Sequence, residues 1–170
     1  ATHVPVGNDQ KQHLELTRDI AMKFNRDFKC ENFFPIPEPI IEKDISRIMS
    51  LKDGSQKMSK SDASEYSRIS LLDESDEIIK KIKKAKTADS VMPGKIEEVQ
   101  KLAEVNNLLN IYSGFSEIEK HKLVEQYEGQ NFSQFKSDLS DVLVERLNPI
   151  TTEVKKLMQD IGYLSEILLD

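Results

Sequence analysis

The sequence predicts an α/β segment followed by an all-α segment, and three patterns along its 170 residues support this. Residues 2–6 are short, rich in β-branched side chains and followed by Gly7, which is typical of a buried strand that ends in a turn. A helical stripe of apolar residues follows this strand directly. From Asp73 onward, apolar residues recur every three or four positions, which predicts a bundle of helices. We therefore expect one domain over residues 1–72 and a helical domain over residues 73–170.

The first helix is expected to begin at Asn8 or Asp9, because either side chain can act as an N-cap. Its predicted buried stripe consists of Leu14, Leu16, Ile20, Ala21 and Phe24. Residues 33–41 contain three alternating prolines and are predicted to be a loop or an edge strand, because proline removes ladder donors. A short buried strand should follow, with the apolar positions Ile45, Ile48, Met49 and Leu51.

A basic face is predicted on the first helix of the second segment. Asp73 and Asp76 are typical of a capped helix start, and apolar residues at 78, 79 and 82 form its buried stripe. The remaining surface should carry Lys80, Lys81, Lys83, Lys84 and Lys86. Such a face contacts RNA phosphates in one reading and is only solvated in the other.

Three further helical regions are predicted downstream. One runs from Ile96 to Tyr112, and the residues 116–119 read as a capping box that opens a helix ending at Gly129. A long amphipathic pattern then extends over residues 132–161 and should be bent or interrupted at Asn148-Pro149.

Composition limits the classes of function. The net charge of −6 argues against a protein that coats nucleic acid through bulk charge, so any RNA contact should be local. The single cysteine, Cys30, excludes an internal disulfide, and the three scattered histidines show no zinc-ligand spacing. No apolar run approaches the ~20 residues that a membrane-spanning helix needs. We expect a soluble intracellular protein with no structural metal.

The residues 53–62, below called the lysine loop, carry the clearest chemical pattern. Lys57 and Lys60 stand three positions apart among small hydroxyl residues, with Gly54 before them. Several donors can therefore converge on a polyanion, and we predict a phosphate-binding loop. An ordinary exposed polar loop is the alternative reading.

A second candidate site lies where the first strand meets the first helix. Free backbone N–H groups are expected there, at the edge of the sheet where open α/β folds bind ligands. Gly7 lets the backbone approach a sugar or base closely, and the Asp9 carboxylate can accept hydrogen bonds from ribose hydroxyls. Capping of the helix by Asp9 is an equal alternative.

Two motifs together resemble a known family. Lys57-Met58-Ser59-Lys60-Ser61 matches the KMSKS signature of class I aminoacyl-tRNA synthetases at every position. The run Val-Pro-Val-Gly-Asn-Asp-Gln-Lys-Gln-His-Leu-Glu-Leu-Thr-Arg-Asp over residues 4–19, with Arg-Ile-Met-Ser-Leu over residues 47–51, is similar to the tryptophanyl-tRNA synthetase family of bacterial and organellar type. Similar stretches recur at residues 108–112, 126–129 and 135–139, so that the resemblance covers nearly the whole chain.

The resemblance implies specific residue roles. It assigns ATP binding to Gly7, Asn8, Asp9, Ile48, Lys57, Met58, Ser59, Lys60 and Ser61, with Lys57 and Lys60 also catalytic. It assigns contact with tryptophan to Val4, Val6 and Gln10. Buried strand or core positions are the alternative for Val4, Val6 and Ile48, and His13 is interpreted as structural. Two departures concern the lysine loop, because Gly54 and Ala63 stand where the family often has proline.

The resemblance also implies a fold and an activity. The chain should be the C-terminal part of a Rossmann-like nucleotide-binding domain followed by a helical domain on the anticodon side. The implied activity is that of a tryptophan–tRNA ligase, with ATP and Mg²⁺, tryptophan and tRNA(Trp) as reactants. A homodimer that binds neither DNA nor membrane, in the bacterial cytoplasm or the mitochondrial matrix, is expected. The upstream phosphate signature and the acid that reads the indole are missing from these residues, and a non-catalytic synthetase-like fragment or paralogue is the alternative.

Overall fold

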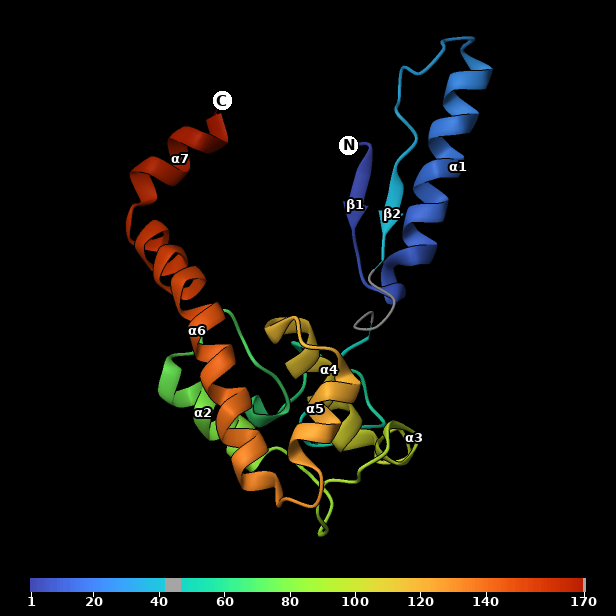
Figure 1. The fold of residues 1–170 in the computed structure, drawn as a ribbon. Coiled ribbons are helices and arrows are strands. Elements are labelled where there is room, and N and C mark those ends of the chain that lie inside the picture. Colours follow the sequence, from blue (N-terminus) through green and yellow to red (C-terminus); the bar gives the residue numbers. More distant parts are fainter. Residues whose placement is uncertain (42–46, 170) are drawn as a thin grey trace. The chain divides into compact units, whose positions relative to one another are not determined.

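The computed structural model describes residues 1–41 and 47–169, and of Asp9 only the backbone. The chain forms two compact units, Ala1–Arg47 and Ile48–Asp170. Each unit is described by itself below, and Figure 1 shows the elements of both.

The first unit is a strand–helix–strand motif with a parallel sheet. Strand β1 (His3–Pro5) leads through the 3₁₀ helix η1 (Asn8–Gln10) into helix α1 (Lys11–Asp27), and strand β2 (Glu38–Ile40) returns beside β1. Val4 stands opposite Pro39 in the parallel register. The pairing continues beyond β1, because the Val6 N–H donates to the Ile40 carbonyl at 3.1 Å. The predicted first strand is present but is not buried, since only Val4 is half-buried, and residues 38–40 of the proline-rich stretch form the expected edge strand.

The buried stripe predicted for α1 is only partly correct. Ala21 is buried, and Leu14 and Phe24 are half-buried, but Leu16 and Ile20 are 61% and 60% exposed. A helix that packs on one small sheet can bury only the side facing that sheet, so the wider apolar stripe stays uncovered. The predicted N-cap is also wrong, because α1 has Gln10 at this position and η1 precedes it.

The second unit is helical. After the 3₁₀ helix η2 (Glu65–Ser67) come the helices α2 (Ser75–Lys84), α3 (Ile96–Val99), α4 (Ala103–Ser116), α5 (Lys120–Tyr127), α6 (Phe132–Gln159) and α7 (Ile161–Leu169). In Figure 1, α2 lies against the first half of α6, and α4 and α5 complete the body around them. The observed order, a strand–helix–strand unit and then helices, confirms the predicted α/β and all-α segments.

One apolar core holds α2, α4, α5 and α6 together. Its aromatic centre contains Phe135, whose ring centroid lies 5.2 Å from that of Tyr127 and 5.6 Å from that of Tyr112. Burying a side chain of this size contributes about 1.5–3 kcal/mol. Residues that precede the helices join the same core, since Leu51 is 2% exposed and Ile48 packs against it. The predicted boundary after residue 72 therefore differs from the division into compact units and stays a prediction.

The start of α2 differs from the prediction. Its N-cap is Glu74, which forms a capping box with Glu77. Asp73 instead accepts hydrogen bonds from the Ser70 N–H at 2.9 Å and from the Lys81 ammonium at 2.5 Å. The side chains of this ion pair are only 11% and 10% exposed. Removing one member of such a pair costs about 3–5 kcal/mol, so Asp73 serves the packing of α2 instead of its cap.

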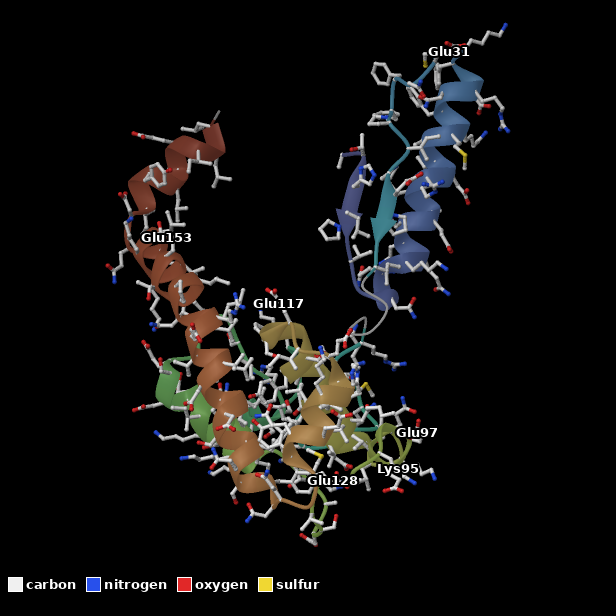
Figure 2. The ribbon with its side chains drawn as sticks, in the orientation of Figure 1. Glu31, Lys95, Glu97, Glu117, Glu128 and Glu153 are labelled. Carbon is white, nitrogen blue, oxygen red and sulfur yellow. The ribbon has the colours of Figure 1, made fainter. Side chains whose placement is uncertain are left out.

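The predicted capping box at residues 116–119 is wrong. Ser116 ends α4 and donates its hydroxyl to the Tyr112 carbonyl, while Glu117 adopts a left-handed conformation with φ of 61°. Figure 2 labels Glu117 at this helix end. The next helix, α5, has Glu119 as its N-cap and ends at Tyr127. Gly129 follows with φ of 70°, as predicted for a glycine that closes a helix.

Two other helical predictions are met in part. The helical region predicted from Ile96 to Tyr112 consists of two helices, α3 and α4. Helix α6 continues through Pro149, so the predicted interruption is wrong, while the alternative of a bend stays a prediction. Among the described residues, no helix is long and apolar enough to cross a membrane.

Candidate active site

A single β-bridge forms the base of the lysine loop. Met49 pairs with Lys57 in antiparallel fashion, where the sequence predicted a strand. Two hydrogen bonds flank the bridge: the Ser50 N–H donates to the Gln56 carbonyl at 2.8 Å, and the Met58 N–H donates to the Ile48 carbonyl at 3.1 Å. Among the residues that the structure describes, the predicted short buried strand is reduced to this bridge, and Ile45 lies outside them.

The segment before the loop is fixed to the helical core. Leu51 is buried, its N–H donates to the Ser67 carbonyl at 2.9 Å, and its carbonyl accepts from the Lys86 N–H at 2.8 Å. Two segments that are distant in sequence therefore hold one residue on both sides. The lysine loop therefore begins shortly after a residue that is fixed to the helical core.

The tip of the loop is an ordered turn. The Asp53 carboxylate accepts hydrogen bonds from the Ser55 hydroxyl at 2.6 Å, from the Ser55 N–H at 2.9 Å and from the Gln56 amide at 2.9 Å. These donors, Ser55 first, hold the pKa of Asp53 below its usual value. Gly54 is buried against α4, where an added Cβ would lie 2.7 Å from the Ala103 carbonyl carbon. Only glycine fits this approach.

The predicted phosphate-binding residues follow on the exposed side of the bridge. Lys57, Ser59, Lys60 and Ser61 are exposed, while Met58 is half-buried against the helical core. The Ser59 and Ser61 hydroxyls are hydrogen-bonded at 2.9 Å. The structure thus brings residues 57–61 and Ile48 together at the bridge, and the two lysines and the two hydroxyls belong to one exposed segment.

The far end of the loop is held by an arginine. The Arg68 guanidinium donates to the Asp62 carbonyl at 2.9 Å and to the Ser64 carbonyl at 3.3 Å. The bridge at Met49 and this clamp enclose the two lysines, so that the lysines belong to a loop with both ends fixed.

The other predicted site residues lie in the first unit. Val4 and Val6 are half-buried and flank Pro5, and Gly7 and Asn8 form the turn into η1. Of Asp9, the structure describes only the backbone, within η1. Val4 lines an apolar hollow of about 380 Å³ with residues of α1 and the proline-rich stretch, namely Leu14, Thr17, Ile20, Ala21, Phe34, Pro35 and Pro37.

The His13 side chain contacts Gln10, one of the residues predicted to bind tryptophan. Its Nδ1 lies 3.0 Å from the Gln10 side-chain oxygen, one helical turn away. This contact is consistent with the structural role expected for His13, since it orients Gln10. The predicted ATP and tryptophan residues are therefore divided between the two compact units.

Comparisons with known proteins give the family. The family model described as tRNA synthetases class I (W and Y) matches residues 1–148. The chain belongs to this family of class I tRNA synthetases. Proteins named tryptophan–tRNA ligase from Mesorhizobium japonicum and Caulobacter vibrioides are 47% and 49% identical to it, over 100% and 99% of the chain. The chain spans about half the length of these relatives, 53% and 49%.

Solved structures of the family show the same fold. The tryptophanyl-tRNA synthetase from Mycoplasma pneumoniae superposes with a TM-score of 0.72 at 31% identity, over 91% of this chain and 48% of that one. The enzyme from Campylobacter jejuni, crystallised with ADP and tryptophan, gives a TM-score of 0.62 at 24% identity, over 99% and 50%. The predicted Rossmann-like part followed by a helical domain is confirmed as the fold class.

The basic face of this class I synthetase chain is narrower than predicted. Lys80, Lys83, Lys84 and Lys86 are exposed, but Lys81 is buried with Asp73, so the prediction is wrong for Lys81. Two of the exposed lysines are engaged. The Lys86 ammonium lies 2.7 Å from the Glu104 carboxylate, and that of Lys84 lies 4.3 Å from the centre of the Tyr66 ring.

Three residues that hold the lysine loop escaped sequence reasoning: Gly54 as a close-packing position, Arg68 as a clamp, and Asn107. The Asn107 side chain accepts the Met49 N–H at 2.8 Å and donates to the Met49 carbonyl at 2.7 Å. A usable signal was present for Asn107, since it stands between Val105 and Leu108 within the buried run of α4. Among the described residues no group of three or more histidine, cysteine, aspartate or glutamate side chains is placed to hold a metal ion.

Proposed function

We propose that the protein to which this chain belongs is a tryptophan–tRNA ligase. It activates tryptophan with ATP, bound as its magnesium complex, and transfers the tryptophanyl group to tRNA(Trp). The relatives with 47% and 49% identity carry this name, which supports tryptophan over tyrosine as the amino acid. The observation that carries the proposal is the intact lysine loop, anchored at Met49 and at Arg68.

The two lysines suit the chemistry of the first step. The tryptophan carboxylate attacks the α-phosphorus of ATP, the bond from this phosphorus to the bridging oxygen breaks, and pyrophosphate leaves. Negative charge grows on pyrophosphate in the transition state, and preorganised cations stabilise it there. Lys57 and Lys60 supply these cations. In the second step a hydroxyl of the terminal tRNA ribose attacks the acyl carbon and AMP leaves.

The remaining predicted contacts complete the proposal. Gly7, Asn8 and Asp9 bind the ribose of ATP, and Ile48 contacts the adenine. Val4, Val6 and Gln10 contact tryptophan. We also propose that the enzyme is a homodimer, which sedimentation of the full-length protein would show.

The test removes one cation from the loop. In the full-length protein, Lys60→Ala should lower the single-turnover rate of pyrophosphate release about a hundredfold, because a preorganised donor of this kind contributes ~3 kcal/mol to the transition state. Tryptophan binding should change little, since the charge acts mainly on the leaving group.

Lys122→Ala is the matched control, because it removes one charge from an exposed lysine on α5. If Lys60→Ala and Lys122→Ala release pyrophosphate at the same rate, Lys60 has no part in the mechanism. If the unaltered full-length protein shows no tryptophan-dependent exchange of pyrophosphate, the non-catalytic alternative holds.

A further inference from the structure

Asn107 satisfies both backbone groups of a residue that lies 58 positions earlier in the chain. The side chain is 2% exposed and projects from α4 to the Met49 peptide. Its oxygen accepts the Met49 N–H at 2.8 Å, and its amide nitrogen donates to the Met49 carbonyl at 2.7 Å. The asparagine side chain thus occupies the place of a neighbouring strand.

The geometry of the bridge explains why this contact is needed. The hydrogen bonds of the bridge belong to the flanking residues Ile48, Ser50, Gln56 and Met58, and not to Met49. The N–H and carbonyl of Met49 therefore point away from Lys57, and Asn107 meets them on that other side. Without Asn107 a half-buried donor and a half-buried acceptor would lose their partners.

The contact also connects helix α4 to the residue that pairs with the first lysine of the loop. Lys57 is the residue opposite Met49, and Lys60 follows three positions later. Met49 is thus held between Asn107 on one side and the start of the phosphate-binding residues on the other. A shift of the Met49 peptide changes the position from which both lysines extend.

We propose that Asn107 is a positioning residue for the lysine loop, which holds the Met49 peptide so that Lys57 and Lys60 meet the departing pyrophosphate. This inference rests on the proposed function. It gives α4 of the helical domain a role in the activation step, although α4 carries none of the reacting groups. Misplacement of a preorganised cation weakens the transition state more than the ground state, so the role should be visible in kcat and not in KM.

The substitution Asn107→Asp separates positioning from packing. The aspartate has the same shape and keeps an acceptor for the Met49 N–H. Its second oxygen can donate to the Met49 carbonyl only when the carboxyl is protonated, and burial raises the pKa of such a carboxyl. The contact is therefore broken at pH 8 and repaired as the pH falls.

The expected kinetic result follows from this titration. In the full-length protein at pH 8, kcat for tryptophan-dependent pyrophosphate exchange should fall about tenfold, with KM for tryptophan unchanged, since a lost hydrogen bond of ~1.4 kcal/mol corresponds to that factor. Relative to the control variant, kcat should recover between pH 8 and pH 5.5. Asn106→Asp is this control, because it adds the same charge one position earlier on α4.

Other charged groups near the contact do not imitate the recovery. Asp53 and Glu104 lie on the loop and on the helix that meet at Gly54, and Lys86 pairs with Glu104. Hydrogen bonds from Ser55 lower the pKa of Asp53, and Lys86 lowers the pKa of Glu104, so both carboxylates stay ionised over this range. Other groups titrate in both variants, so their effect cancels when kcat of Asn107→Asp is divided by kcat of Asn106→Asp at each pH.

Hydrogen exchange gives a readout that needs no activity. At pH 8, peptides covering residues 48–58 should exchange about tenfold faster in Asn107→Asp than in Asn106→Asp, while peptides covering residues 135–147 of the core stay unchanged. Equal exchange in the two variants, or faster exchange throughout the second unit, overturns the proposal. A kcat ratio that stays at unity or does not rise toward low pH also overturns it. If the unaltered enzyme is inactive while the local exchange differs as expected, the proposed function fails and the anchoring of the loop by Asn107 stands.

Discussion

The hydroxyl of Tyr127 lies between two polar groups in the interior of the second unit. It donates to the Asp138 carboxylate at 2.6 Å and lies 3.1 Å from the Tyr112 hydroxyl. Burial, and next the hydrogen bond to Asp138, raise the pKa of Tyr127 far above its usual range. The ring is 2% exposed, so its neutral form is part of the packed core.

Alkaline pH should therefore unfold the second unit. In the unfolded chain Tyr127 ionises near pH 10, as a free tyrosine does, while in the folded chain it keeps its proton. The unfolded state then binds fewer protons, and the free energy of unfolding falls by up to ~1.4 kcal/mol per pH unit above pH 10 from this group. Below pH 10 the group has no effect.

The absorbance of tyrosinate at 295 nm measures this directly, because the chain contains no tryptophan. The Tyr127 hydroxyl should ionise only together with the loss of helical circular dichroism. In Tyr127→Phe the absorbance change that accompanies unfolding should be smaller by one tyrosinate. A Tyr127 signal that titrates before the helices unfold would contradict the assignment.

The sequence indicates which residues form the lysine loop, but it indicates only part of the contacts that those and other residues make. The lysine loop was found because its five letters match a signature at every position. Lys81 was assigned to the surface, although it follows Ile78 by three positions and so lies on the buried face of α2. Its partner Asp73 stands before the helix, and periodicity within a helix gives no information about such a contact.

At the scale of elements, the approach of the lysine loop to α4 is unusually close. Gly54→Ala should place a methyl group against backbone atoms of Ala103 and Glu104, which cannot move aside as a side chain can. We expect a loss of about 1–3 kcal/mol in the free energy of unfolding, as for other overpacked positions. Urea unfolding would measure it.

Gly162→Ala is the control, because a Cβ there would meet only the Asp160 carboxylate at an ordinary 3.6 Å. This variant should be neutral or slightly stabilising, since alanine favours a helix over glycine by about 1 kcal/mol. If both variants unfold at the same urea concentration, the loop is not packed against α4 in solution.

Helix α2 offers fewer lysines to RNA than its sequence suggests. Lys80 and Lys83 are exposed, while Lys81 is buried and Lys84 and Lys86 have partners. If α2 contacts tRNA phosphates, the double substitution Lys80→Gln and Lys83→Gln should reduce the salt slope of tRNA binding by about two, one unit for each lost phosphate contact.

The matched control is the double variant Lys95→Gln and Lys101→Gln, two exposed lysines outside α2. Titrations of tRNA(Trp) at several salt concentrations would separate the two variants. Identical slopes for both would mean that the lysines of α2 are only solvated.

Helix existence was well predicted and helix ends were not. The stripes of α2, α5 and α6 follow a period that side-chain burial imposes on sequence. The position of a helix end depends on a few hydrogen bonds. Several neighbouring residues near each end are of types that can cap a helix, so the sequence does not say which of them does. Glu74 caps α2 in place of Asp73, and Glu119 begins α5 where Ser116 was expected.

At the scale of the whole molecule, the first unit leaves much apolar surface uncovered. Its sheet has two parallel strands, although parallel sheets are normally covered on both faces and two strands alone are marginally stable. Leu16, Ile20 and Phe28 are exposed on α1 or directly after it, and Leu168 and Leu169 are exposed at the end of α7.

A polypeptide of residues 1–170 alone should therefore self-associate and should not exchange pyrophosphate in the presence of tryptophan. Sedimentation velocity and the exchange assay measure the two parts of this prediction. Replacing Leu16 and Ile20 by lysine should reduce the association, whereas replacing the exposed residues Lys122 and Glu125 by alanine should not. A monomer that melts cooperatively and catalyses the exchange would refute both parts.

The contact between Met49 and Asn107 also orders events during synthesis. The two residues are 58 positions apart, so the ribosome makes the lysine loop well before it makes α4. At about 5–20 residues per second, roughly 3–12 s pass before Asn107 is added. During that interval the Met49 peptide lacks the side chain of Asn107, and the nascent loop can be held only by contacts encoded nearby in the sequence, such as the bridge and the Arg68 clamp.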